Sequence, residues 1–303
     1  MIKFSSSFFR KSWIAIPYAT CLLLLVLPLL SIISISFSEF SASFPPYSSI
    51  FQWTDTETFQ VRLSFANYSL VIHDSMLYGK AYSNSLFIAF LSTFFCLLLG
   101  YPMAYGITRF SPRKQLLWLM LSALPFATSF LVRVYSWMNI LSPDGVGMHL
   151  LQEIGIPPSF HLMHTTVGVI IGIVYSYLPF MIFPIYASLS RIDPTLLEAA
   201  HDLGCKPFRA LRTITIPLSL PGIFSGASLV FIPAMGEYII PELLGGSSSL
   251  TIGRLLWYEF FTNRDWPVAC ALAVCMIVLL FIPIILFERL QPKLKDPYKD
   301  FLH

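Results

Sequence analysis

The sequence predicts an all-α integral membrane protein with six membrane-spanning helices. Hydrophobic residues make up 56% of its 303 residues, and only 12% are charged, about half the charged share of an ordinary soluble domain. The mean hydropathy is +0.71. A surface so poor in charge suits lipid better than water, and so apolar a chain is not intrinsically disordered.

Six apolar runs are each long enough to cross a bilayer, which takes about 17–25 residues in a helix. Helices are expected because lipid offers no water to unpaired backbone groups. The runs also lack the alternation of membrane β-strands. The predicted spans are Trp13–Phe37, Ser83–Ile107, Gln115–Leu141, Thr165–Leu189, Leu220–Ile240 and Pro267–Phe287.

The first run has two possible interpretations, a signal peptide or a retained helix. Lys3, Arg10 and Lys11 precede it, as basic residues precede a signal peptide. The apolar run is, however, much longer than the 7–15 residues or so of a signal peptide's hydrophobic region. We therefore expect a retained first transmembrane helix at residues 13–37.

Loop charge predicts that both chain ends face the cytoplasm, because cytoplasmic loops carry an excess of Lys and Arg. The predicted outer side has only Arg62, Lys80, Arg254 and Arg264, and Arg133 lies within the third span. The other side carries Lys3, Arg10, Lys11, Arg109, Arg113, Lys114, Arg191, Lys206, Arg209, Arg212, Arg289, Lys293, Lys295 and Lys299. The predicted layout is a cytoplasmic N-terminus (1–12), the first transmembrane helix (13–37), an outer loop (38–82), a transmembrane core (83–287) containing a cytoplasmic loop (190–217), and a cytoplasmic tail (288–303).

The 190–217 loop is predicted to form two short helices. Asp193 is a suitable N-cap and Pro194 a suitable first-turn residue. Gly204 is placed to end the first helix, and Pro207 to start the second. Leu196, Leu197, Ala200 and Leu203 would lie near one face of the first helix. On these residues alone, the loop either docks a soluble partner or packs on its own helical bundle.

A motif within this loop points to a transport function. Glu198-Ala199-Ala200 is followed at fixed spacing by Gly204, Ile214 and Ile216-Pro217. The pattern resembles the EAA motif of permease subunits of ATP-binding cassette importers, with Ile216 where leucine is usual. The resemblance implies a six-helix type I importer permease bundle whose coupling loop docks on an ATPase subunit. It implies coupling roles for Glu198, Ala199, Ala200, Gly204, Ile214 and Pro217.

Within that loop, the resemblance implies that Ala199 and Ala200 allow close approach to the ATPase. Gly204 supplies the turn and Glu198 orients the loop. Each of these residues could instead be structural only. Glu198, for example, could simply pair with a nearby arginine.

A second set of strings resembles the spermidine/putrescine group of these permeases. The resemblance implies a polyamine substrate, a second and similar permease chain, two ATPase subunits and an extracytoplasmic solute-binding protein. The strings are Gly100-Tyr101-Pro102, Pro143-Asp144-Gly145, Pro233-Ala234-Met235-Gly236-Glu237-Tyr238, Pro241-Glu242-Leu243-Leu244-Gly245-Gly246, Ile252-Gly253 and Asn263-Arg264-Asp265-Trp266-Pro267.

A polyamine path should offer carboxylates and aromatic faces to ammonium groups. Glu237 lies in the outer part of the fifth span, where a charge is costly and usually faces a cavity or a partner. Alternatively, Glu237 pairs with Arg133 and is structural. Trp137 and Tyr177 are either path residues or interface anchors. The candidate path residues are Glu237, Tyr238, Glu242 (one turn on if the helix continues), Tyr135 and Tyr175.

Two pairs of glycines give the fourth and fifth spans a small face. They are Gly168-xxx-Gly172 and Gly222-xxx-Gly226. Small faces let helices approach closely. We expect these faces in a bundle that packs against a second permease chain.

Other function classes lack their signatures. A phosphate-binding loop is absent, so ATP hydrolysis is expected on another chain, and neither an HExxH nor a GxSxG motif occurs. The five cysteines form no CxxC pair. We expect no metal, no cofactor and no nucleic-acid partner. The rival interpretations are a secondary transporter or channel, a membrane enzyme, or an importer for an amino acid, thiamine, iron or an anion.

Overall fold

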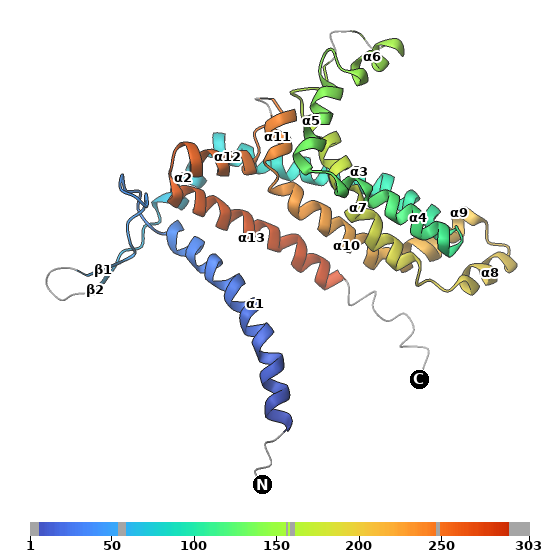
Figure 1. Cartoon of the computed structure of the whole chain (residues 1–303), viewed down its shortest axis with the longest axis horizontal. Coiled ribbons are helices and arrows are strands. Elements are labelled where there is room, and N and C mark those ends of the chain that lie inside the picture. The colour runs from blue at the N-terminus through green and yellow to red at the C-terminus, as the bar shows by residue number, and fades with distance from the viewer. Residues whose placement is uncertain (1–5, 54–58, 156, 158–160, 247–248, 291–303) are drawn as a thin grey trace. The chain divides into compact units, whose positions relative to one another are not determined.

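The computed structural model describes residues 6–53, 59–155, 157, 161–246 and 249–290, which are mostly helical (Figure 1). The predicted basic residues Lys3, Lys293, Lys295 and Lys299 lie outside the described residues. Among the described residues, five helices have the length and hydropathy to cross a membrane, and a bent pair could form a sixth span. The five long helices are α1 (Ser6–Ser36), α3 (Lys80–Thr108), α7 (Thr166–Leu189), α10 (Ile216–Met235) and α13 (Trp266–Leu290).

The chain divides into two compact units. Unit 1 comprises Met1–Ser75 and Leu256–Leu279, and unit 2 comprises Met76–Leu255 and Leu280–His303. The shorter elements are β1 (Phe51–Trp53), β2 (Phe59–Val61), α2 (Ala66–His73), η1 (Ser75–Gly79), α4 (Pro112–Ala123), η2 (Leu124–Ala127), α5 (Phe130–Leu141), α6 (Val146–Glu153), α8 (Pro194–Asp202), α9 (Pro207–Ala210), η3 (Leu211–Thr215), α11 (Ile239–Leu244), α12 (Ile252–Trp257) and η4 (Tyr258–Thr262).

Within unit 1, the predicted outer loop has structure of its own. Strands β1 and β2 pair as an antiparallel hairpin with Gln52 opposite Gln60, a small addition to an otherwise helical chain. The buried amide of Asn67 on α2 donates to the carbonyl oxygens of Ser36 at 2.9 Å and Ser38 at 2.8 Å. Because the last carbonyls of a helix have no partner within it, these bonds fix the end of α1.

The third predicted span is not one helix. The α4–η2 segment and the α5–α6 segment meet at an angle of 88°. The break lies at Thr128 and Ser129, where Thr128 has an extended backbone and its hydroxyl donates to the carbonyl of Pro125 at 2.9 Å. These hydroxyl residues turn the chain, so the expected continuous helix over Gln115–Leu141 was wrong.

The fifth predicted span also ends early. Helix α10 stops at Met235, and α11 begins only at Ile239. Gly236 follows α10, and the side chain of Glu237 accepts hydrogen bonds from the first N–H groups of the new helix. The single helix expected over Leu220–Ile240 is therefore two, so Glu237 lies in the turn before α11 and Glu242 lies within α11, rather than one turn apart on a continuous helix.

The core of unit 2 is the group of α3, α7 and α10, which pack on one another (Figure 1). Met181 and Ile185 of α7 and Val230 of α10 are fully buried there. The glycine faces of the fourth and fifth predicted spans pack within this chain. A Cβ atom built on Gly222 would lie 2.6 Å from the carbonyl oxygen of Pro184, and one on Gly172 would lie 2.7 Å from Leu244 Cδ1.

Substituting Gly222 by valine is expected to destabilise the α7–α10 pair. The added Cβ meets backbone, which yields less readily than a side-chain tip, and overpacking typically costs about 1–3 kcal/mol. We expect a lower thermal midpoint and a lower yield of assembled complex, measured by fluorescence-detected size exclusion. Gly106→Val is the matched control, because a Cβ there meets no described atom within 4 Å. Equal losses in both variants would contradict the packing argument.

Candidate functional site

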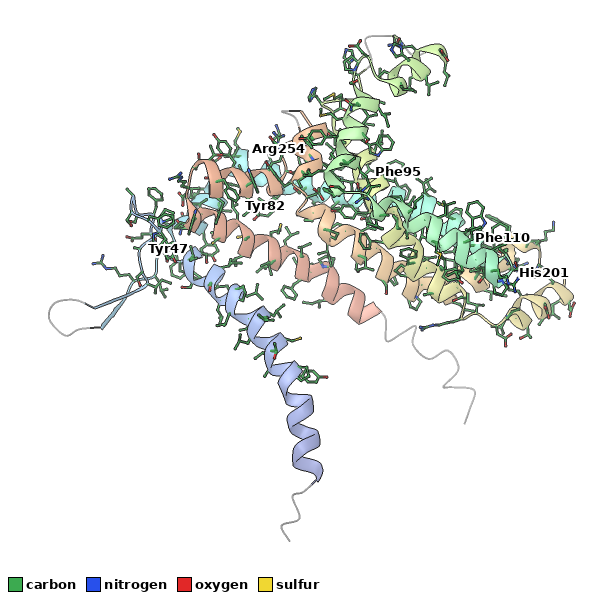
Figure 2. The ribbon with its side chains drawn as sticks, in the orientation of Figure 1. Tyr47, Tyr82, Phe95, Phe110, His201 and Arg254 are labelled. Atoms are coloured by element: carbon green, nitrogen blue, oxygen red, sulfur yellow. The ribbon has the colours of Figure 1, made fainter. Side chains whose placement is uncertain are left out.

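The 190–217 loop contains the first helix that the sequence predicts, α8, whereas the second is not a separate short helix, because α9 begins a continuous helical path from Pro207 to Met235. Asp193 Oδ1 accepts a hydrogen bond from Thr195 N–H at 3.0 Å, and Pro194 occupies the first turn of α8. At the other end, Gly204 adopts a left-handed φ of +78°. Its N–H donates to the carbonyl of His201, labelled in Figure 2, at 2.8 Å, and Cys205 N–H donates to the carbonyl of Ala200 at 2.9 Å. Both helix ends are thus closed by local bonds.

The loop exposes apolar side chains as well as polar ones. Leu196, Leu197 and Ala200 are half-buried, whereas Leu203 is 89% exposed, so it does not share their inward face as expected. Phe208 on α9 is 76% exposed. Large apolar side chains standing free on a polar loop are typical of a docking surface. Of the predicted coupling residues, Glu198, Ala199, Gly204 and Pro217 are exposed, and Ala200 and Ile214 are half-buried.

The N-cap of α8 can be tested directly. The hydrogen bond from Thr195 N–H lowers the pKa of Asp193. The stabilisation of α8 by this cap is therefore fully present above the ordinary pKa of a carboxyl group, including at neutral pH. It is lost as the pH falls through the lowered pKa of Asp193. Asp193→Ala is expected to reduce ATP-coupled uptake by about two- to fivefold, whereas Asp193→Asn, which keeps a capping oxygen, should not. A substitution at Asp202, at the far end of α8, provides the positional control. Equal losses in the Ala and Asn variants would exclude the cap as the cause.

A second polar site lies in the turn between α10 and α11. Glu237 is only 9% exposed. Its Oε1 accepts hydrogen bonds from Ile239 N–H at 3.1 Å and Ile240 N–H at 3.4 Å, and its Oε2 accepts one from the Tyr177 hydroxyl of α7. A buried carboxylate needs such donors, because removing a charge from water is costly. The turn is therefore held to α7 by a carboxylate.

Arg133 of α5 belongs to the same neighbourhood. Arg133 is 8% exposed, and its helix packs against both α7 and α11. The guanidinium carbon lies 5.3 Å from the Phe126 ring centroid and 5.6 Å from that of Phe130. Within the described part of the chain, Arg133 Nε and Nη1 have no hydrogen-bond partner. The alternative in which Arg133 pairs with Glu237 is not formed in this structure, since the ion pair found among the described residues joins Arg254 to Glu242.

The other candidate path residues are dispersed. Glu242 pairs with Arg254, labelled in Figure 2, at 2.7 Å, and Arg254 Nη1 also donates to the Gly246 carbonyl at 3.1 Å. Tyr135 is exposed, and Tyr238 is half-buried. Tyr175 packs edge-on against Trp137 with ring centroids 5.3 Å apart. Tyr177, which the sequence left as either a path residue or an interface anchor, is the tyrosine whose hydroxyl contacts Glu237.

Comparisons with known proteins agree on one family. Residues 87–296 match the family described as binding-protein-dependent transport system inner membrane component. The spermidine/putrescine transport system permease protein PotB of Haemophilus influenzae is 32% identical over 289 residues, covering 95% of this chain and 96% of that protein. PotB of Escherichia coli (strain K12) is 37% identical over 214 residues, covering 70% and 78%.

The fold has solved counterparts. A chain of a bacterial alginate ABC transporter, in complex with an alginate pentasaccharide-bound periplasmic protein, superposes with a TM-score of 0.70 at 16% identity, covering 95% of this chain and 96% of that chain. A chain of the MetNI methionine ABC transporter gives a TM-score of 0.55, also at 16% identity, with coverage of 77% and 99%. The chain therefore belongs to the family of binding-protein-dependent transport system inner membrane components, as a multi-pass inner membrane permease of the ABC importer class and not an enzyme.

Proposed function

We propose that this chain is a permease subunit of an ATP-driven polyamine importer and forms half of the path for putrescine or spermidine. The observation that carries the proposal is the 32% identity over 95% of the chain to a spermidine/putrescine permease. The buried carboxylate of Glu237 gives the proposal a chemical basis, because the path must attract a cation.

Glu237 is the proposed ammonium contact. Its Oε2 faces the Tyr177 hydroxyl, a neutral donor. An ammonium group arriving at the same oxygen would form a charge-assisted hydrogen bond, roughly twice as strong as a neutral one. Oε1 would stay bonded to Ile239 N–H and Ile240 N–H, so the turn would keep its shape while Oε2 changes partner.

The 190–217 loop is the proposed docking site for an ATPase subunit, through the exposed Leu203 and Phe208. The helical path from Pro207 to Met235 is continuous over 29 residues. At a rise of 1.5 Å per residue it is about 43 Å long. One end adjoins the proposed docking loop, and the other leads directly into the turn that holds Glu237. A movement imposed on the loop would thus be transmitted along this continuous helical path to the carboxylate.

The remaining partners follow from this class of transporter. A second, similar permease chain would complete the path, and an extracytoplasmic binding protein would deliver the solute. Two ATPase subunits would hydrolyse ATP on the cytoplasmic side, where both ends of this chain are expected. Nucleotide would favour one access state by binding it more tightly than the other.

The test is uptake of radiolabelled putrescine and spermidine into proteoliposomes that contain the full complex. We expect uptake that requires both ATP and the loaded binding protein. Uptake without an ATPase subunit would favour the secondary transporter instead. ATP hydrolysis stimulated by the binding protein, with neither polyamine transported, would retain the importer class and overturn the substrate.

A further inference from the structure

Arg133 is a buried cation whose hydrogen-bonding capacity is largely unused. Its side chain is 8% exposed, and its Nε and Nη1 have no partner within the described part of the chain. The rings of Phe126 and Phe130 attract the charge, yet they accept no conventional hydrogen bond. A guanidinium has five N–H donors, and leaving such donors buried and unpaired is costly. The site therefore calls for an anionic partner in another state of the protein.

The carboxylate best placed to serve as this partner is Glu237. Helix α5 packs against α11, which follows the Glu237 turn, and against α7, whose Tyr177 donates to Glu237. Arg133, Tyr177 and Glu237 therefore lie on segments that pack on one another. Because the chain breaks at Thr128 and Ser129, α5 is not continuous with α4.

We propose that Arg133 is a specificity-determining residue that competes with the substrate cation for the Glu237 carboxylate. This inference rests on the proposed polyamine function and deepens it. When the path is empty, Arg133 displaces Tyr177 and neutralises Glu237. When an ammonium group arrives, it takes the carboxylate, and Arg133 lies against the Phe126 and Phe130 rings, the position that its guanidinium occupies in this structure.

The competition would set which solutes bind. A cation such as Na⁺ or K⁺, which has no N–H donors, would not displace a guanidinium that can bind a carboxylate through two hydrogen bonds. An ammonium group, which has three N–H donors, would displace the guanidinium. An internal counter-ion therefore keeps the carboxylate neutralised in the empty transporter and limits it to substrates that replace the lost hydrogen bonds.

The test measures equilibrium binding of radiolabelled putrescine and spermidine to the full importer in nanodiscs. The importer is held with ATP by ATPase subunits that cannot hydrolyse it, and no binding protein is added. The variants are Arg133→Met, Arg133→Lys, Glu237→Gln and the Arg133→Met/Glu237→Gln double variant. We expect Arg133→Met to lower the Kd by about fivefold or more, the scale of a coupling between two sites. Arg133→Lys should remain close to wild type.

The double variant separates competition from a structural role. In the Glu237→Gln background, Arg133→Met should no longer change the Kd. An unchanged or raised Kd for Arg133→Met beside Glu237 would overturn the proposal. If Arg133→Met does not assemble, Arg133→Gln replaces it. Failure of both variants to assemble would make the residue structural and overturn the proposal too.

Failure of the proposed function would give a different result. In that case wild type would bind neither polyamine. A double-mutant cycle would still report whether Arg133 and Glu237 interact, because it requires no ligand. It compares the thermal midpoints of substrate-free wild type, Arg133→Met, Glu237→Gln and the double variant. A relative 27% identical to this chain is a putative 2-aminoethylphosphonate permease. Binding of that zwitterion by wild type, lost in Arg133→Met, would instead assign Arg133 to an anionic ligand group and overturn the competition.

Discussion

Replacing Gly204 by valine is expected to reduce ATP-driven uptake by about tenfold or more while ATP hydrolysis continues. Gly204 has a φ of +78°, and a Cβ there would meet no described atom within 4 Å. The effect must therefore come from the backbone. A left-handed conformation costs a residue other than glycine roughly 1–2 kcal/mol, which alters a conformational ratio about 5- to 30-fold. The measurement is the ratio of uptake to ATP hydrolysis in proteoliposomes.

Two further variants isolate the cause. Gly204→Asn also adds a side chain in open space, but asparagine adopts the left-handed conformation readily, so its coupling should stay near wild type. Gly155 is also left-handed, with a φ of +98°, and also open, but it lies outside the loop. Gly155→Val should leave coupling unchanged. Normal coupling in Gly204→Val, or equal loss in Gly204→Asn, would exclude the backbone turn as the coupling element.

The long helices were predictable because length and hydropathy alone determine them. The two breaks were not, because prolines are poor markers of a break inside a membrane helix. Pro102 in α3 and Pro184 in α7 lie within helices that continue past them. The actual breaks depend on side chains that bond backbone, such as Thr128 and Glu237. Whether a given hydroxyl or carboxylate bonds to the backbone in this way depends on the packing around it.

The two candidate sites differ for the same reason. The 190–217 loop is built from local signals: an aspartate before a proline starts α8, and a glycine ends it. These contacts join residues only a few positions apart, so they can be predicted from the sequence. The bond from Tyr177 of α7 to Glu237 in the turn after α10 joins residues 60 apart in the sequence. The neighbouring sequence does not distinguish Tyr177 from Tyr175. Only the packing of α7 on α10 determines which tyrosine reaches Glu237.

The second large effect is expected at Glu237. Glu237→Gln should lower polyamine uptake by about 10- to 100-fold, the range expected when a hydrogen bond to a charged group is lost. The local structure should persist, because the amide oxygen of glutamine can still accept from Ile239 N–H and Ile240 N–H. Only the charge and one acceptor oxygen are removed. Uptake should be measured at saturating concentrations of loaded binding protein, so that delivery is not limiting.

Glu242→Gln is the matched control. Glu242 lies on α11, directly after the turn that holds Glu237, but its carboxylate is partly exposed and paired with Arg254 at 2.7 Å. Because an exposed ion pair contributes little, its loss should change uptake less than about twofold. Stimulation of ATP hydrolysis by the binding protein should survive in both variants, since neither touches the 190–217 loop. Equal losses in the two variants would indicate a general effect of outer charge.

The combination of readouts assigns a role to the carboxylate. If Glu237→Gln loses uptake but keeps stimulated ATP hydrolysis, nucleotide still drives the cycle and the substrate is not captured. If both are lost, the 29-residue helical path from Pro207 to Met235 no longer ends in an ordered turn, and Glu237 is structural. The cation-contact prediction therefore requires the first result, with the thermal midpoint of the variant complex close to that of wild type.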